Sequence, residues 1–254
     1  MYIKINNLNL YYEKYGNRKQ TIVILPGWGN NRLTFNYLIN DLKDYFTIYI
    51  IDYPGFGNSS LNKDLTLYDY TNIIYQFIKK LNLENSILIG HSFGGRIISI
   101  LTTTYNIKIK KLLLIDVAGL KEYNFKVYIK KKIYKLLKLL IKLLPKKLRN
   151  KYLNKLFNKF ASNDYKLLPN NLYKTFKNII SINLKDYYKK INLETLILWG
   201  EYDNITPYKM GIKLNKLIKN STLIKINNTK HFPYLEKRYL VNKIIYEYLK
   251  KDII

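Results

Sequence analysis

The chain contains no cysteine and only two histidines, His91 and His231, among its 254 residues. Without cysteine it can form no disulfide bond and no thiolate metal site, and it has no cysteine nucleophile. Two histidines are also too few for a histidine-rich metal centre. We therefore expect chemistry that needs neither a metal nor an organic cofactor.

Long apolar runs are missing as well. No stretch reaches the roughly eighteen uninterrupted apolar residues of a transmembrane helix, so no membrane span is expected. The N-terminal sequence M-Y-I-K-I-N-N has no basic region followed by an apolar core, so no signal peptide is visible. These features predict a cytoplasmic protein.

Acidic residues are scarce: 17 Asp and Glu stand against 44 Lys and Arg, which gives a formal net charge of +27. Such an excess favours contact with nucleic acid, an acidic protein or an anionic membrane. The chain is also rich in Lys, Asn, Ile and Tyr, whose codons are AT-rich, and nucleotide bias offers a second explanation for the lysines. No nucleic-acid recognition motif accompanies the charge, so nucleic acid is not an expected partner.

Short apolar runs alternate with amphipathic segments along most of the chain. The runs predict a hairpin and six further strands, at 2–5, 8–15, 21–25, 47–51, 87–89, 112–115, 195–199 and 222–226. Helical patterns lie between them, at 33–42, 67–81, from 93 onward, 208–218 and 239–249. This alternation predicts an α/β fold with a mostly parallel sheet covered by helices on both faces, and ligands bind beyond the carboxyl ends of such strands.

The alternation stops after Gly119, and no buried strand is evident from Lys121 to Lys190. We expect a core formed by 1–118 and 192–254 and a helical lid insertion at 119–191. The segment from Lys121 to Lys190 has 20 Lys and Arg and 3 acidic residues, so +17 of the net charge of +27 lies there. Uniform codon bias would not concentrate charge in this way.

Four lysines fall on one narrow stripe of the helical pattern at 127–144: Lys131, Lys135, Lys138 and Lys142. One interpretation is a solvated stripe on a lid helix. The other is a docking surface for an acidic carrier protein or an anionic membrane.

The most informative stretch is S-I-L-I-G-H-S-F-G-G at 86–95. An apolar strand precedes G-x-S-x-G and a helical pattern follows it, which is the context of a nucleophile elbow. Ser92 is then the nucleophile, and Gly90 and Gly94 let strand and helix approach closely. The alternative is a buried serine in an ordinary turn.

A serine hydroxyl needs a base, and His231 is the candidate because it follows the last strand at the same sheet edge. His91 is interpreted as a packing residue of the elbow. The base needs a carboxylate, and Asp203 gives the chain order Ser92, Asp203, His231. Asp116, at the end of an earlier strand, is the main alternative. The oxyanion of the reaction would be bound by the backbone N–H groups of Phe93 and Trp28.

The sequence resembles the α/β-hydrolase superfamily over essentially its whole length, and within it the lid-bearing carboxylesterases. The resemblance lies in L-P-G-W-G-N-N, I-G-H-S-F-G-G-R, W-G-E-Y-D-N-I-T-P and K-H-F-P-Y-L-E. It implies the same triad and the same oxyanion hole. Two departures stand out, since many relatives have His-Gly where this chain has Pro26-Gly27 and glycine where it has Lys230.

The expected reaction is hydrolysis of a small carboxylic ester, or a related acyl compound, through an acyl-serine intermediate. The same triad also serves thioesterases, acyltransferases, C–C bond hydrolases and lyases, so the fold alone leaves these open. A non-catalytic binding protein and a membrane-associated lipid esterase are the further alternatives.

Overall fold

The computed structural model describes residues 1–29, 32–121, 125–160 and 172–253. The chain divides into two compact units, Met1–Leu120 with Asn178–Ile254, and Lys121–Lys177. All the described strands belong to the first unit, and the described elements of the second are helical. Residues 122–124 and 161–171 of the expected insertion lie outside the described part of the chain, and its role as a lid remains a prediction.

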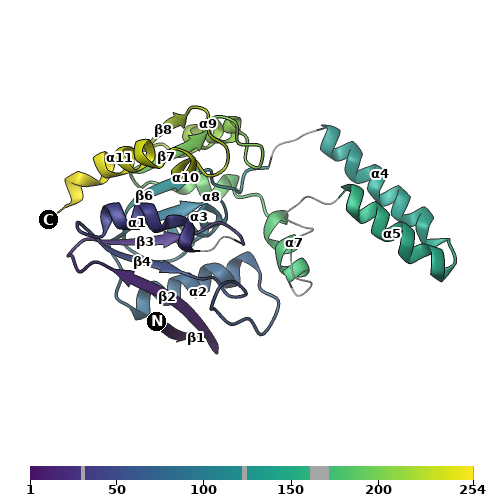
Figure 1. Cartoon of the computed structure of the whole chain (residues 1–254), viewed down its shortest axis with the longest axis horizontal. Helices are drawn as coiled ribbons and strands as arrows, with labels where there is room; N and C mark the ends of the chain where they lie inside the picture. The colour runs from purple at the N-terminus through teal and green to yellow at the C-terminus, as the bar shows by residue number, and fades with distance from the viewer. Residues whose placement is uncertain (30–31, 122–124, 161–171, 254) are drawn as a thin grey trace. The chain divides into compact units, whose positions relative to one another are not determined.

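The first unit contains an eight-stranded sheet in the order β1-β2-β4-β3-β5-β6-β7-β8 (Figure 1). Its strands are β1 (Tyr2–Ile5), β2 (Leu8–Tyr15), β3 (Thr21–Leu25), β4 (Thr47–Ile51), β5 (Ser86–His91), β6 (Ile109–Ile115), β7 (Thr195–Gly200) and β8 (Ser221–Ile226). The pairs β1–β2 and β2–β4 are antiparallel, and every other pair is parallel. The α/β fold and mostly parallel sheet expected from the sequence are confirmed.

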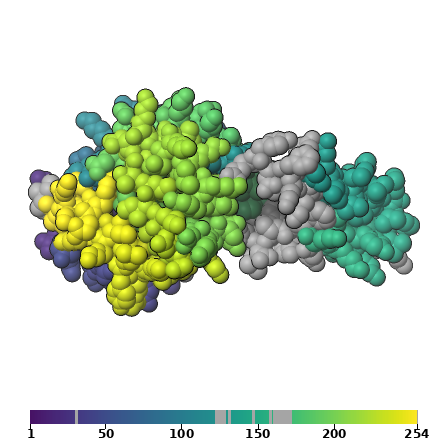
Figure 2. Space-filling model, turned by 90° about the horizontal axis from the view of Figure 1, so that it is seen from above, coloured from purple at the N-terminus to yellow at the C-terminus, as the bar shows by residue number. Residues whose placement is uncertain are grey.

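Helices lie between the parallel strands and after the last strand. They are α1 (Asn36–Leu42), α2 (Leu67–Lys80), α3 (Phe93–Thr104), α8 (Lys185–Lys190), α9 (Tyr208–Leu217), α10 (Pro233–Glu236) and α11 (Arg238–Leu249), with 3-10 turns at Arg32–Phe35 and Lys250–Asp252. In the space-filling view the last third of the chain, drawn green to yellow, forms much of the visible surface of this unit (Figure 2). The sequence predicted one helix over 33–42. The structure has a 3-10 turn first, and only the second part of this segment is α-helical.

Two apolar cores lie on opposite faces of the sheet, because alternate side chains of a strand point to opposite faces. In β3, Val23 and Leu25 join the core beneath α2, α3, α8 and α9, whereas Ile22 and Ile24 join the core beneath α1 and α11. All four side chains are fully buried. A strand that is apolar at every position therefore reflects a sheet covered on both faces.

The ends of the helices also follow from the sequence, as α2 shows. Thr66 accepts a hydrogen bond from the backbone N–H of Asp69 at 3.2 Å, and the Asp69 carboxylate accepts one from the backbone N–H of Thr66 at 2.7 Å. This reciprocal capping satisfies two N–H groups that have no acceptor within the helix.

The second unit contains α4 (Phe125–Lys142) and α5 (Lys146–Phe160), which contact each other. The helix α7 (Tyr173–Ser181) spans the border between the units. Among the described residues, no helix combines the length and the apolar character needed to cross a bilayer.

The helix α4 has three distinct faces. Tyr134, Leu137 and Ile141 are half-buried. Three lysines of the predicted stripe, Lys135, Lys138 and Lys142, are exposed, whereas the side chain of Lys131 lies outside the described structure. A further face carries exposed apolar side chains, namely Ile129, Ile133, Leu136, Leu139 and Leu140.

Candidate active site

Ser92 lies in the tight turn between β5 and α3, with φ +47° and ψ −103°. A residue with a side chain rarely adopts a positive φ, so surrounding contacts must hold it there. The Ser92 N–H donates to the carbonyl of Ile115 at 3.1 Å, and its carbonyl accepts from the N–H groups of Gly95 and Ala118 at 3.2 and 3.0 Å. Ser92 is half-buried, whereas the residues on either side of it are buried.

The two glycines around Ser92 allow this turn to pack. A Cβ atom on Gly94 would overlap the backbone carbonyl of Leu25 in β3, and one on Gly90 would lie 2.5 Å from Cδ1 of Ile98. Backbone atoms of the neighbouring strand cannot swing aside as a flexible side chain can. Glycine at these positions therefore brings α3 against the sheet and presents residue 92 at its edge.

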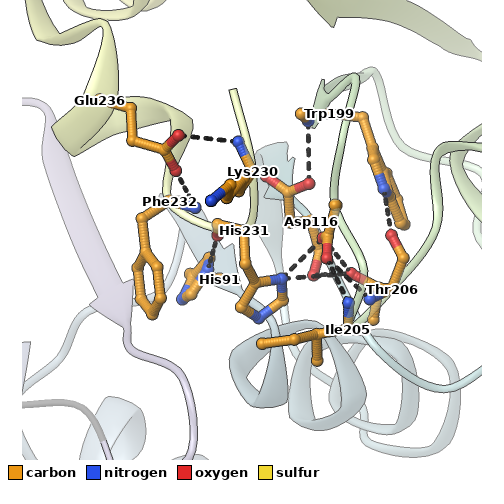
Figure 3. A network of polar contacts seen from close by, with 11 residues as sticks. His91, Asp116, Trp199, Ile205, Thr206, Lys230, His231, Phe232 and Glu236 are labelled. Atoms are coloured by element: carbon orange, nitrogen blue, oxygen red, sulfur yellow. Dashed lines mark hydrogen bonds and ion pairs between the residues drawn. The ribbon is translucent and has the colours of Figure 1, made fainter. Parts of the chain in front are cut away.

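Asp203 and His231 meet at the same edge, beyond the ends of β7 and β8. Figure 3 shows His231 with Asp116 and Thr206 beside it. The Nδ1 atom of His231 lies 2.7 Å from Oδ2 of Asp203, and both residues are buried. A carboxylate can only accept, so Nδ1 carries the proton and Nε2 of the neutral ring has a free lone pair for a proton. This arrangement orients one imidazole tautomer.

Three further donors hold the Asp203 carboxylate. Its Oδ1 atom accepts from the backbone N–H groups of Ile205 and Thr206 at 2.7 and 2.9 Å, and its Oδ2 atom accepts from the Thr206 hydroxyl at 2.6 Å. Burial alone would raise the pKa of Asp203, but the bonds from His231 and Thr206 outweigh it and lower that pKa. Asp203 is therefore an ionised and firmly oriented carboxylate.

Asp116, the alternative acid, is fully buried at the end of β6. Its Oδ1 atom accepts from the backbone N–H of Gly200 at 2.9 Å. Burial and the negative charge of Asp203 raise the pKa of Asp116 to about 10. The geometry pairs the imidazole with Asp203 and places Asp116 next to that pair.

The backbone of His231 is held from two sides. Nε2 of His91 donates to the carbonyl of His231 at 2.8 Å, since a carbonyl oxygen can only accept. The Glu236 carboxylate accepts from the N–H groups of Lys230 and Phe232 at 2.8 and 3.2 Å, one residue before and one after His231. The elbow and α10 thus both fix the loop that carries the imidazole.

The predicted oxyanion donors lie at the ends of two elements. Phe93 is the first residue of α3, so its N–H is one of those without an acceptor inside the helix. Trp28 follows β3, and its half-buried ring makes edge contacts with Phe56, Tyr70 and Phe93 at 4.8, 6.0 and 5.1 Å between centroids. An aromatic cluster therefore lies beside the elbow.

Asp116, Asp203 and His231 each place one polar atom within 4.8 Å of the others. A metal ion would need free lone pairs on these atoms. Both oxygens of Asp203 and Nδ1 of His231 are already engaged by protein donors and acceptors. The arrangement suits proton transfer better than metal binding.

Sequence reasoning missed Thr206, Glu236 and the polar contact of His91. Thr206 could have been found from its spacing, because it is a hydroxyl residue three positions after Asp203. At this spacing the aspartate carboxylate can accept from the N–H and the hydroxyl of the later residue within one turn. Glu236 carried no signal of its own, because its function depends on where α10 folds back. His91 was read as a packing residue, and its ring also bonds a residue 140 positions away.

Residues 20–238 match the family described as alpha/beta hydrolase fold. A pimeloyl-[acyl-carrier protein] methyl ester esterase of Wigglesworthia glossinidia brevipalpis is 31% identical, over 95% of this chain and 98% of that protein. An uncharacterized hydrolase of Bacillus subtilis is 26% identical, over 97% of this chain and 96% of its own. Among solved structures, an esterase from Exiguobacterium antarcticum superposes with a TM-score of 0.75 at 22% identity and covers 98% of both chains, which shows the fold.

We expect His91→Gln to change how stability depends on pH. Burial, followed by the nearby His231, lowers the pKa of His91 to about 3, whereas an unfolded histidine titrates near 6.5. Between these pH values the unfolded chain binds a proton on this histidine, whereas the folded chain does not. In wild type, His91 therefore lowers the free energy of unfolding by about 1.4 kcal/mol for each pH unit below 6.5.

Glutamine can still donate to the His231 carbonyl but does not titrate, so the variant should lack this part of the slope. Urea unfolding of both proteins between pH 4 and 7 measures it. Parallel curves for the two proteins would show that His91 is not held neutral by the fold.

Proposed function

The chain belongs to the α/β-hydrolase family and is an esterase-like hydrolase, and from this we propose that it cleaves a carboxylic ester with Ser92 as nucleophile, His231 as base and Asp203 as acid. The observation that carries the proposal is the bond from His231 Nδ1 to a carboxylate that three more donors orient. That bond leaves Nε2 free to accept a proton at the edge where Ser92 lies.

In the proposed mechanism, Nε2 of His231 takes the hydroxyl proton of Ser92 as the oxygen attacks the ester carbonyl. The resulting imidazolium is stabilised by Asp203, whose lowered pKa keeps it ionised. His231 then gives the proton to the departing alcohol, and an acyl group remains on Ser92. Water attacks this acyl-serine with the same base, which releases the acid and restores the hydroxyl.

The tetrahedral intermediates carry a negative oxygen. We assign the backbone N–H groups of Phe93 and Trp28 to it. Phe93 begins α3, where the helix dipole adds positive potential. The aromatic cluster around Trp28 supplies an apolar surface for the acyl chain next to these donors.

The substrate we favour is an acyl ester carried by an acidic protein. Support comes from the relative whose printed name refers to an acyl-carrier protein, and from the charge of the second unit. Its exposed lysines Lys135, Lys138 and Lys142 form one stripe of α4, and acidic partners are attracted by such a stripe. A small soluble ester would reach the same triad without this stripe.

Ser92→Ala should abolish ester hydrolysis while leaving the fold intact, because it removes only the attacking oxygen. Loss of a triad serine typically costs on the order of a million-fold in turnover. Hydrolysis of p-nitrophenyl esters and labelling by a fluorophosphonate measure the two effects. Near-normal turnover of the purified variant would refute the assignment, and circular dichroism controls for folding.

The two carboxyl groups should respond differently to the same substitution. Asp203→Asn should lose about three to four orders of magnitude in kcat, because asparagine no longer holds the productive imidazole tautomer. Asp116→Asn, the matched control in the same cluster, should lose far less. Steady-state kinetics of both variants decide the question, and the opposite ranking would move the triad acid to the end of β6.

Replacement of Lys131, Lys135, Lys138 and Lys142 by glutamine tests the stripe. Surface charges act mainly on association and are screened within about 8–10 Å at ordinary salt. Turnover of a small soluble ester should hardly change. The KM for a carrier-linked ester should rise, and its dependence on salt should become flatter.

A matched control replaces four exposed lysines of the first unit, Lys216, Lys219, Lys243 and Lys251, in the same way. It removes equal charge but should not alter the KM for the carrier-linked ester. If the stripe variant keeps the wild-type salt curve, the stripe is a solvated face. If only an ester in anionic vesicles is affected, the partner is a membrane.

A further inference from the structure

Asp116 is a fully buried carboxyl group, and one of its two oxygens has no hydrogen-bond partner among the described residues. Its Oδ1 atom accepts from the Gly200 N–H, but Oδ2 is buried and no described group donates to it. The backbone N–H of Asp116 donates to the carbonyl of Leu198 at 3.1 Å, and the bond from the Gly200 N–H orients the side chain. The unpaired oxygen therefore does not result from a loosely placed side chain.

The carboxyl group of Asp203, which is 5% exposed, is a close neighbour, because one of its oxygens lies within 4.8 Å of an oxygen of Asp116. Two ionised carboxylates side by side in a buried site are strongly unfavourable, and one of them takes up a proton. Asp203 already has four donors, whereas Asp116 has a single one. The proton therefore belongs on Asp116.

We propose that Asp116 is a neutral carboxylic acid whose proton forms a hydrogen bond to the Asp203 carboxylate, so that Asp116 is a positioning residue for the catalytic acid. The bond gives Asp203 a fifth donor. It also accounts for the oxygen that has no partner, because a protonated Oδ2 needs an acceptor and Asp203 supplies one.

The charged and titratable groups around Asp116 favour this state. They are Asp203, His231, Glu236 and Tyr234, and within the described structure neither lysine nor arginine bonds Asp116. Burial first, and then the charge of Asp203, raise the pKa of Asp116 to about 10, in line with the geometry. The pair of carboxyl groups thus holds one negative charge, which matches the one positive charge of His231 during the reaction.

The proposed bond would favour the ionised form of Asp203 during the reaction. A carboxylate that accepts an extra hydrogen bond is harder to protonate, so Asp203 stays ionised when His231 becomes positive. The bond also adds to the contacts from Ile205 and Thr206 that orient the Asp203 carboxylate. The positioning role rests on the proposed triad, whereas the proton itself can be tested without any activity.

The first test compares unfolding of wild type and Asp116→Asn by urea between pH 5 and 8. Asparagine imitates a protonated aspartate, since it donates to Asp203 and accepts from Gly200, but it never titrates. An unfolded aspartate is ionised above about pH 4, so only folded wild type binds this proton. The ratio of the unfolding constants, wild type over variant, should therefore rise about tenfold per pH unit.

The matched control is Asp52→Asn. Asp52 is also a buried carboxyl group, but it bonds a cation, Arg32, at 2.9 Å. Its ratio should show no such rise, because this carboxyl group lies beside a positive charge and not beside a second carboxylate. A ratio for Asp116→Asn that is independent of pH would show that Asp116 is ionised and would overturn the proposal, whether or not the protein hydrolyses esters.

The second test concerns the positioning role. Asp116→Leu keeps the branching of the side chain but removes the donor, and kcat/KM should fall about tenfold to a hundredfold, the effect expected for one hydrogen bond to an ion. Asp116→Asn should recover most of that loss. Equal losses in the two variants, measured on folded protein, would show that the donor is not what matters. If Ser92→Ala stays active, the triad fails instead, and the unfolding ratio still reports the proton.

Discussion

The hydrogen bond between His231 and Asp203 is the interaction on which the arrangement of this site depends. It joins two loops that follow β7 and β8, and every nearby contact helps to hold one of its two ends. Thr206 and the backbone at Ile205 orient the carboxylate, while His91 and Glu236 fix the backbone of His231. Because a carboxylate is costly to bury, its four donors are a condition for placing it there.

The sheet supplies this geometry through its parallel strands. β5, β6, β7 and β8 are neighbours with the same direction, so Ser92, Asp116, Asp203 and His231 all emerge at one edge. Gly200 shows how closely these loops approach, since a Cβ atom there would overlap the carbonyl of Lys230. The apolar cores on both faces keep the strands rigid, which lets residues far apart in sequence meet at hydrogen-bond distance.

The second unit is distinguished by its charge and by its exposed side chains. Its helices α4 and α5 carry many lysines, and one face of α4 exposes apolar side chains such as Leu136 and Leu139. Charge of one sign adds little to the stability of a helix pair but governs association with an oppositely charged partner. The first unit holds the residues of the proposed triad, and the proposed selection of an acidic carrier depends on the surface of the second.

Local sequence was enough for the strands and for most of the helices, and it predicted the order Ser92, Asp203, His231 of the candidate triad. Buried strands stand out as apolar runs, and Gly94 near Ser92 marks a turn at which a Cβ atom would overlap the backbone of β3. The 3-10 turn before α1 was not foreseen, because helix ends depend on what the chain packs against.

Which side chains contact each other at the sheet edge was decided only by the tertiary structure. Asp116 and Asp203 were both plausible acids in the sequence. The strand order β6-β7-β8 and the turn at Thr206 place Asp203, and not Asp116, in hydrogen-bond contact with the imidazole of His231. The same order left Asp116 buried beside a charged neighbour, a relation that arises from strand pairing and that no local pattern encodes.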